Sequence, residues 1–100
     1  MYIEKRSVTD AIEKGLPAYI QNMLWYLLEL KEEFHYFDLS VAPDDKGKPM
    51  QKIIHRIPSC QDEYAYHDKN FVESNIVVKA DISGHIMMFT NEMHPRSKNS

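Results

Sequence analysis

The sequence predicts an α+β fold: one long amphipathic helix packed on a mostly antiparallel five- or six-stranded sheet. Two observations carry this prediction. Residues 17–34 repeat their apolar side chains at helical spacing, so that these side chains share one face. From residue 35 onward, short runs alternate apolar and polar side chains, which is the spacing of strands, and turn-forming residues separate the runs.

The helix is predicted over residues 17–34, PAYIQNMLWYLLELKEEF. Pro17 suits the first turn of a helix because the N–H group that proline lacks would have no partner there. On a helical wheel, one broad arc holds the apolar side chains of Tyr19, Ile20, Met23, Leu24, Tyr26, Leu27, Leu28, Leu30 and Phe34. The opposite arc holds the polar side chains of Gln21, Asn22, Glu29, Glu32 and Glu33. We therefore expect one face of this helix to pack on the core.

Strands are predicted in five segments after the helix: residues 35–41, 51–57, 62–67, 74–82 and 85–93. The segment PDDKGKP between the first two strands is typical of a turn. Pro58 ends the second strand, and a tight turn at Gly84 makes the last two strands a hairpin. We expect apolar side chains on both faces of that hairpin: Ile76, Val78, Ile86 and Met88 on one, and Val77, Met87 and Phe89 on the other.

The opening segment, residues 4–14, fits two structures. Ser7 and Asp10 have the spacing of a capping box for a short helix. Val8 and its neighbours instead favour a strand around residues 4–10, which is the structure we expect. The segment belongs to a single predicted domain, residues 1–93, which a flexible tail follows at residues 94–100.

Composition and charge argue against several classes of protein. A net charge of −3 and scattered basic residues disfavour binding to nucleic acid. The longest apolar run, MLWYLL, is much shorter than the ~20 residues of a membrane-spanning helix, so we expect no membrane partner. A single cysteine cannot form an internal disulfide, and the segment MYIEKRSVTD lacks the apolar middle of a signal peptide. Together these features favour the cytoplasm.

The stretch QKIIHRIPSC, residues 51–60, holds a histidine, an arginine and the only cysteine of the chain. Its alternation predicts a strand with His55 on one face and Arg56 on the other, followed by a turn at Cys60. His55, Cys60 and His67 could be proposed as zinc ligands, but their spacing fits no zinc-binding pattern. Cys60 could be proposed as a nucleophile with either histidine as its base, but no glycine-rich loop accompanies it. We therefore expect no metal, no cofactor and no catalytic residue.

Five motifs follow one another along residues 5–92: RSVTDAIEKGLP, a helix containing LW, FDLSV, QKIIHRIPSCQDEYAY and VVKADISGHIMMF. This order resembles a small uncharacterised family of Gram-positive bacteria and their phages, the domain of unknown function nine hundred and sixty. The chain has VTDA where that family has VTRG, so we infer no functional role for this segment from the family. The resemblance implies a bacterial or phage origin and a small α+β fold, and it implies no known activity.

The function we expect is that of a non-enzymatic protein-interaction module of bacterial or phage origin. For a family linked to phages, such modules include inhibitors of a host defence protein, such as anti-CRISPR proteins. The resemblance suggests this specific role, and the residues themselves do not. The alternative is a small enzyme or ligand-binding domain that uses His55, Tyr64 and Tyr66 on neighbouring strands.

Trp25 marks the predicted interaction surface. On the helical wheel it lies on the polar arc, although tryptophan is enriched where binding energy concentrates. One helix covers only one face of a sheet, so the apolar second face of the hairpin also needs a cover. We expect an interface of Trp25, Val77, Met87 and Phe89 with a protein partner or with a second copy in a homodimer. The alternative is that the N-terminal segment covers these residues within the monomer.

Overall fold

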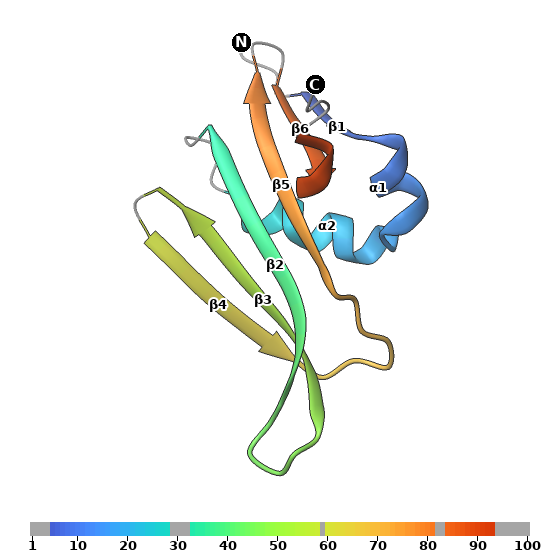
Figure 1. Ribbon diagram of the computed structural model, residues 1–100, viewed down its shortest axis with the longest axis vertical. Helices are drawn as coiled ribbons and strands as arrows, with labels where there is room; N and C mark the ends of the chain where they lie inside the picture. The colour runs from blue at the N-terminus through green and yellow to red at the C-terminus, as the bar shows by residue number, and fades with distance from the viewer. Residues whose placement is uncertain (1–4, 29–32, 59, 82–83, 94–100) are drawn as a thin grey trace.

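The computed structural model describes residues 5–28, 33–58, 60–81 and 84–93, and its architecture is α+β (Figure 1). Two α-helices lie between the first and second strands along the chain: α1 (Asp10–Gly15) and α2 (Ala18–Leu27). The strands are β1 (Lys5–Val8), β2 (Phe34–Pro43), β3 (Pro49–Ile57), β4 (Cys60–Tyr66), β5 (Ser74–Asp81) and β6 (Gly84–Phe89), and a 3₁₀ turn, η1 (Thr90–Met93), follows. None of the described helices is long and apolar enough to cross a membrane.

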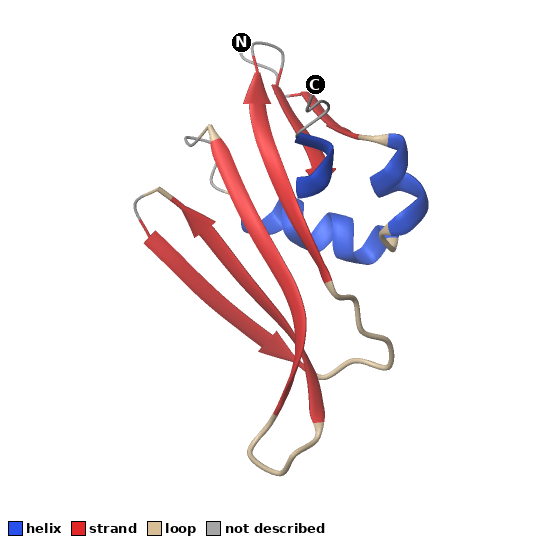
Figure 2. Ribbon diagram, in the orientation of Figure 1, coloured by secondary structure: helices blue, strands red, loops and turns tan. Residues whose placement is uncertain are grey.

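The six strands form one mixed sheet in the order β1-β6-β5-β2-β3-β4. Only β1 and β6 run parallel to each other, and every other neighbouring pair is antiparallel. Figure 2 shows the helices and the sheet as separate layers, with α2 passing behind β5 and β2. The predicted fold class, an amphipathic helix on a mostly antiparallel six-stranded sheet, is confirmed.

The core lies between the helices and one face of the sheet, which we call the inner face; the opposite face is the outer face. The helices contribute a row of buried side chains spaced four residues apart: Ile12, Leu16, Ile20 and Leu24. The sheet contributes Phe37, Leu39, Ile53, Ile76, Val78 and Met87. Residues at alternate positions of a strand share a face, so the strands adjacent to this core present their intervening residues on the outer face.

The predicted helix over residues 17–34 is too long. Leu28 already has an extended backbone, with φ −71° and ψ 135°, and Phe34 is the first residue of β2. Residues 29–32 lie outside the described part of the chain. The predicted core arc is also too wide, because Tyr26 is 87% exposed whereas Ile20 and Leu24 are fully buried. Aromatic residues suit strands as well as apolar helix faces, which is why periodicity alone extended the helix past its end.

The N-terminal segment contains both structures that its sequence allows. Lys5–Val8 form the expected strand, which is shorter than predicted, and α1 begins directly afterwards. The cap of α1 is Thr9 rather than Ser7, because the hydroxyl of Thr9 accepts a hydrogen bond from the Ile12 N–H at 3.3 Å. The strand and the helix both fit into this short segment because a single extended residue, the cap Thr9, lies between them.

The predicted faces of the C-terminal hairpin are wrong. Val77 lies opposite Met88 and Val78 lies opposite Met87, so Met87 belongs to the inner face with Val78. Asp81 pairs with Gly84, which leaves a two-residue connection, and such a connection pairs odd-numbered residues with even-numbered ones. The outer face of this hairpin therefore carries Val77, Ile86 and Met88.

A buried glutamine attaches the connection between β4 and β5 to the sheet. The amide nitrogen of Gln51 donates to the carbonyl oxygens of Ser40 and Val72 at 3.0 and 2.9 Å. Its amide oxygen accepts from the Val72 N–H at 2.8 Å. The side chain of Gln51 is fully buried, and these bonds replace those that its polar atoms would make with water.

Gly84 should tolerate no side chain. Its φ of 147° is strained for other residues, and a Cβ atom would overlap the carbonyl oxygen of Lys5 on the neighbouring strand. We expect Gly84→Ala to lower the free energy of unfolding by roughly 2–4 kcal/mol, from strain and overpacking combined. Urea denaturation measures this change.

Gly47→Ala is the matched control. Gly47 also has a positive φ, 83°, but nothing lies within 4 Å of its Cβ position. Its substitution should cost only about 1–2 kcal/mol, from backbone strain. Equal losses in the two variants would mean that the close contact between β1 and β6 contributes nothing.

Candidate functional site

The stretch QKIIHRIPSC forms the end of β3 and the start of β4, as the predicted alternation requires. His55 lies on the inner face and is 6% exposed, whereas Arg56 lies on the outer face. The expected turn at Cys60 is wrong: Cys60 is the first residue of β4 and pairs with Ile57. An exposed thiol at the start of a strand therefore lies beside a buried imidazole on the same face of the sheet.

A small pocket of about 170 Å³ lies on the inner face between the end of α2 and strands β3 and β4. We call it the inner pocket. Its lining residues are Leu27, His55, Ile57, Cys60, Asp62 and Tyr64. Five of them alternate along the two strands, and Leu27 comes from the last turn of α2. The pocket exists because the buried row of the helices covers the centre of the sheet and not its β4 edge.

His55 belongs to a group of buried imidazoles at the rim of the core. Its Nε2 lies 3.0 Å from Nδ1 of His35, and the two rings are stacked. Phe37 stacks on His55 with ring centroids 4.4 Å apart, and His85 meets His35 edge to face at 6.2 Å. One ring of the His35–His55 pair must donate and the other accept, so at least one facing nitrogen carries no proton. The pair thereby fixes the orientation of both rings.

The three residues considered as zinc ligands are not brought together. His55 contacts His35 in the core, whereas Nε2 of His67 lies 2.9 Å from Oδ2 of Asp44 at the β2–β3 turn. Among the residues that the structure describes, no three His, Cys, Asp or Glu side chains are placed to hold a metal ion.

The tyrosines named in the enzymatic alternative lie in different surroundings. Tyr64 lines the inner pocket with His55, but Tyr66 lies opposite Gln51, outside that pocket. Burial raises the pKa of Tyr66, and the negative charge of Asp68 raises it further. Tyr19 donates a hydrogen bond to Asp68 at 3.0 Å, and its pKa is raised in the same way. Both phenols therefore stay protonated at neutral pH, which argues against Tyr66 as a general base.

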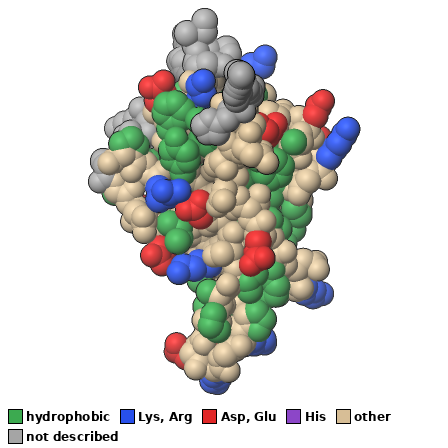
Figure 3. Space-filling view, in the orientation of Figure 1, with side chains coloured by type: hydrophobic (Ala, Val, Ile, Leu, Met, Phe, Trp, Pro, Cys, Tyr) green, Lys and Arg blue, Asp and Glu red, His purple; other side chains and the backbone are tan. Residues whose placement is uncertain are grey.

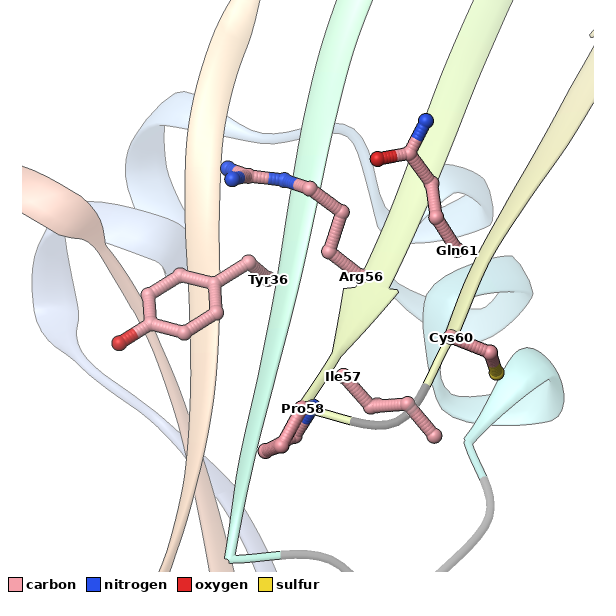
Figure 4. A pocket seen from close by; sticks show the side chains of 6 residues that line it. All are labelled: Tyr36, Arg56, Ile57, Pro58, Cys60 and Gln61. Carbon is pink, nitrogen blue, oxygen red and sulfur yellow. The ribbon is translucent and has the colours of Figure 1, made fainter.

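Hydrophobic side chains are interspersed with acidic and basic ones on the outer face (Figure 3). Phe34 and Tyr36 stack with ring centroids 6.3 Å apart, and Arg56 lies over the Tyr36 ring at 5.6 Å. Arg56 also pairs with Asp38 at 3.0 Å, and Lys52 pairs with Glu63 at 3.5 Å. Figure 4 shows the Tyr36 ring lying across β5, on the same side of the sheet as Arg56.

A shallow hollow of about 450 Å³ opens beside Tyr36 at the β3–β4 end of the sheet (Figure 4). Its lining residues are Tyr36, Arg56, Ile57, Pro58, Cys60 and Gln61. Its one charged side chain, Arg56, already has a carboxylate partner in Asp38. The hollow therefore offers shape and an aromatic surface rather than an unpaired charge.

The four predicted interface residues do not share a surface. Met87 is fully buried in the core, and Phe89 packs against the core from the inner face. Val77 lies on the outer face, where Tyr36 and Met88 flank it. Trp25 is half-buried and packs against the core, and Arg6 of β1 lies over its ring at 5.4 Å. The N-terminal strand therefore contacts the Trp25 ring within the monomer and leaves Trp25 half-buried.

Sequence reasoning missed the residues that make the outer face distinctive. The helical periodicity assigns Phe34 to the helix and gives Tyr36 no role, whereas both are residues of β2. The signal was the aromatic pair at alternate positions, because such positions share one face of a strand.

The chain matches no family model, no curated protein and no solved structure. The resemblance to the domain of unknown function nine hundred and sixty therefore stays a prediction that rests on the quoted motifs.

Replacing either histidine of the pair should destabilise the fold, and replacing both should cost less unfolding free energy than the two single replacements added together. His55→Phe takes the facing partner away from the buried Nδ1 of His35, which should cost about 1–3 kcal/mol of unfolding free energy. The double variant His35→Phe/His55→Phe removes both polar groups, so its cost should fall below the sum of the single costs. Denaturant unfolding of the three variants measures the coupling, and strictly additive costs would contradict it.

Asp44 should make the β2–β3 turn sensitive to acid. Its carboxylate accepts hydrogen bonds from His67 and from the Lys48 and Lys46 N–H groups, and these hold its pKa below the ordinary 3.8. A lowered pKa means that the ionised form stabilises the fold above the unfolded-state pKa. That contribution is lost as the pH falls through the folded-state pKa. Asp44→Asn should therefore lower the urea midpoint at neutral pH and leave it unchanged well below pH 3.8.

Asp45→Asn is the control for this pH dependence, because Asp45 is an exposed neighbour in the same turn. It should leave the urea midpoint unchanged at both pH values. An equal loss at neutral and acid pH in Asp44→Asn would show that the charge of the carboxylate has no role.

Proposed function

We propose that this chain is a non-enzymatic protein-interaction module that binds a protein partner, or a second copy of itself, through the outer face. The observation that carries the proposal is a set of half-buried apolar side chains that three neighbouring strands place there around the fully buried Val77: Phe34, Tyr36, Ile86 and Met88. An antiparallel sheet whose second face meets only water is normally polar on that face. Both described α-helices contribute to the core on the inner face.

The residue types on the outer face support a protein partner. Aromatic residues, methionine and arginine are enriched at the centres of protein interfaces, and tyrosine and arginine often contribute most of the binding energy. Tyr36, Arg56 and Met88 supply these types within one area. Arg56 and Lys52 already pair with carboxylates, which favours a protein over the phosphate backbone of a nucleic acid.

The resemblance suggests the biological setting of the protein and of its partner. A family of Gram-positive bacteria and their phages fits a bacterial or phage protein that works in the cytoplasm. In a phage setting, the partner would be a host protein, and inhibition of a defence protein, as by an anti-CRISPR, is the specific form that we put forward. Its support is the quoted motifs alone, since no residue of the outer face identifies a defence protein.

The inner pocket favours a second candidate, a ligand-binding domain or a small enzyme. His55 and Tyr64 line one concave site, together with Asp62 and the thiol of Cys60. Against it, the pocket holds about 170 Å³, whereas sites for small ligands usually hold ~300–1,000 Å³. The second candidate needs Cys60 or His55 for its activity, and the first does not.

Substitutions on the outer face should weaken the binding of a partner. Tagged wild-type chain is used to capture proteins from Gram-positive host cells, and light scattering follows self-association over a range of concentrations. We expect Tyr36→Ala to weaken the complex or dimer about 30-fold, because removal of a central aromatic anchor typically costs ~2 kcal/mol or more. Met88→Lys should act in the same direction through a buried charge.

Tyr26→Ala is the matched control, because Tyr26 is 87% exposed and lies on α2, away from the outer face. It should leave binding unchanged, as should Cys60→Ser. A captured protein that all four variants retain would place the interaction elsewhere. A concentration-independent monomer that captures no protein would end the proposal.

A further inference from the structure

We propose that β4, an edge strand of the sheet, binds an extended segment of a partner protein that carries lysine or arginine side chains. The segment would add to the sheet as a further strand next to β4. Strand addition of this kind obtains affinity from main-chain hydrogen bonds and specificity from alternate side chains. The edge of β4 shares Glu63 with the outer face but none of the apolar side chains proposed to bind there, so this inference does not depend on the function proposed above.

The first observation is that β4 is an exposed edge strand whose protection is limited to carboxylates. It is the last strand in the sheet order, and it pairs with β3 along all seven residues without interruption. Every residue from Cys60 to Ala65 is exposed. Proteins normally protect such an edge with charged side chains, above all lysine, or with proline, a bulge or a very short strand. The sequence CQDEYAY contains neither proline nor lysine, and its register has no bulge.

The opposite edge of the same sheet shows what protection looks like. There the described part of β1 has four residues, and two of them are the basic residues Lys5 and Arg6. A short basic edge pairs poorly with another strand. The difference between the two edges makes β4 the one that is suited to strand addition.

The second observation is the charge of β4. Asp62 and Glu63 are exposed, they are adjacent and so point to opposite faces, and the strand carries no basic side chain. Lys52 already pairs with Glu63 at 3.5 Å, which leaves the negative charge of Asp62 on the inner face. A second copy of β4 would bring carboxylates alongside carboxylates. An added strand with basic side chains would instead form favourable cross-strand pairs.

The third observation is the inner pocket, which lies beside β4 on the face that carries Asp62. Its volume of about 170 Å³ suits one long side chain rather than a separate ligand. Leu27 and Ile57 give it apolar walls, and Asp62 supplies the charge. A lysine or arginine can lay its aliphatic stem along such walls and direct its charged end to a carboxylate. The pocket thus favours a basic side chain at one position of the added strand.

The test uses a phage-displayed library of random peptides and three forms of the full chain: wild type, Asp62→Lys/Glu63→Lys, and a control with the same charge change, Asp45→Lys/Glu73→Lys. Both control positions are exposed and lie outside β4. Wild type and control should select peptides rich in lysine and arginine and poor in proline. The β4 variant should select acidic peptides. A peptide selected on wild type should bind the β4 variant about tenfold more weakly or worse.

Hydrogen exchange then locates the bound peptide. It should slow the exchange of β4 amides, and Tyr36→Ala should leave the affinity unchanged, which separates this surface from the outer face. If the charge-reversed chain fails to fold, Asp62→Asn/Glu63→Gln replaces it, with loss of the preference for basic peptides expected. Selection of peptides without basic character, identical peptides on wild type and the β4 variant, or unprotected β4 amides would each overturn the proposal.

Discussion

The contact between one row of helix side chains and the inner face is the constraint on which the rest of the structure depends. Ile12, Leu16, Ile20 and Leu24 follow one another at four-residue spacing through both helices, and all are buried against the sheet. A row of this width covers the central strands and not the whole sheet. Three features follow from it: an outer face that neither described α-helix covers, an inner pocket beside β4, and an edge strand whose side chains are exposed.

Polar residues at the margin of this contact fix how the sheet is completed. A buried amide or imidazole is costly unless it is hydrogen-bonded, so Gln51 and the His35–His55 pair permit few alternative arrangements. Gln51 holds the β4–β5 connection through Val72, and His55 keeps the β3 end of the sheet aligned with β2. His55, which suggests chemistry in the sequence, thus acts first as a packing residue. Its link to chemistry is indirect and lies in its place in the lining of the inner pocket.

The sequence predicted the elements that depend on local pattern and missed those that depend on register. Alternation correctly placed His55 and Arg56 on opposite faces of a strand, and it located β2, β3 and β5 to within a few residues. It could not show that Met87 lies opposite Val78, because pairing depends on the length of the connecting turn. It also could not separate Phe34 from the helix, since an aromatic residue suits either structure. Of the residues that line the inner pocket, the sequence singled out His55 and Tyr64; it could not add Leu27 and Asp62, because these two meet only through tertiary packing.

The two proposed surfaces differ in what keeps each of them from unspecific association. On the outer face, the ion pairs Arg56–Asp38 and Lys52–Glu63 interrupt the apolar area and give it a charge pattern that a partner must match. On β4 the protection is a single sign of charge. Carboxylates repel a second copy of the same strand as effectively as lysine would, so the edge is closed to self-association. Unlike lysine, they leave it open to a basic strand, and one pair of side chains therefore both prevents aggregation and selects a partner.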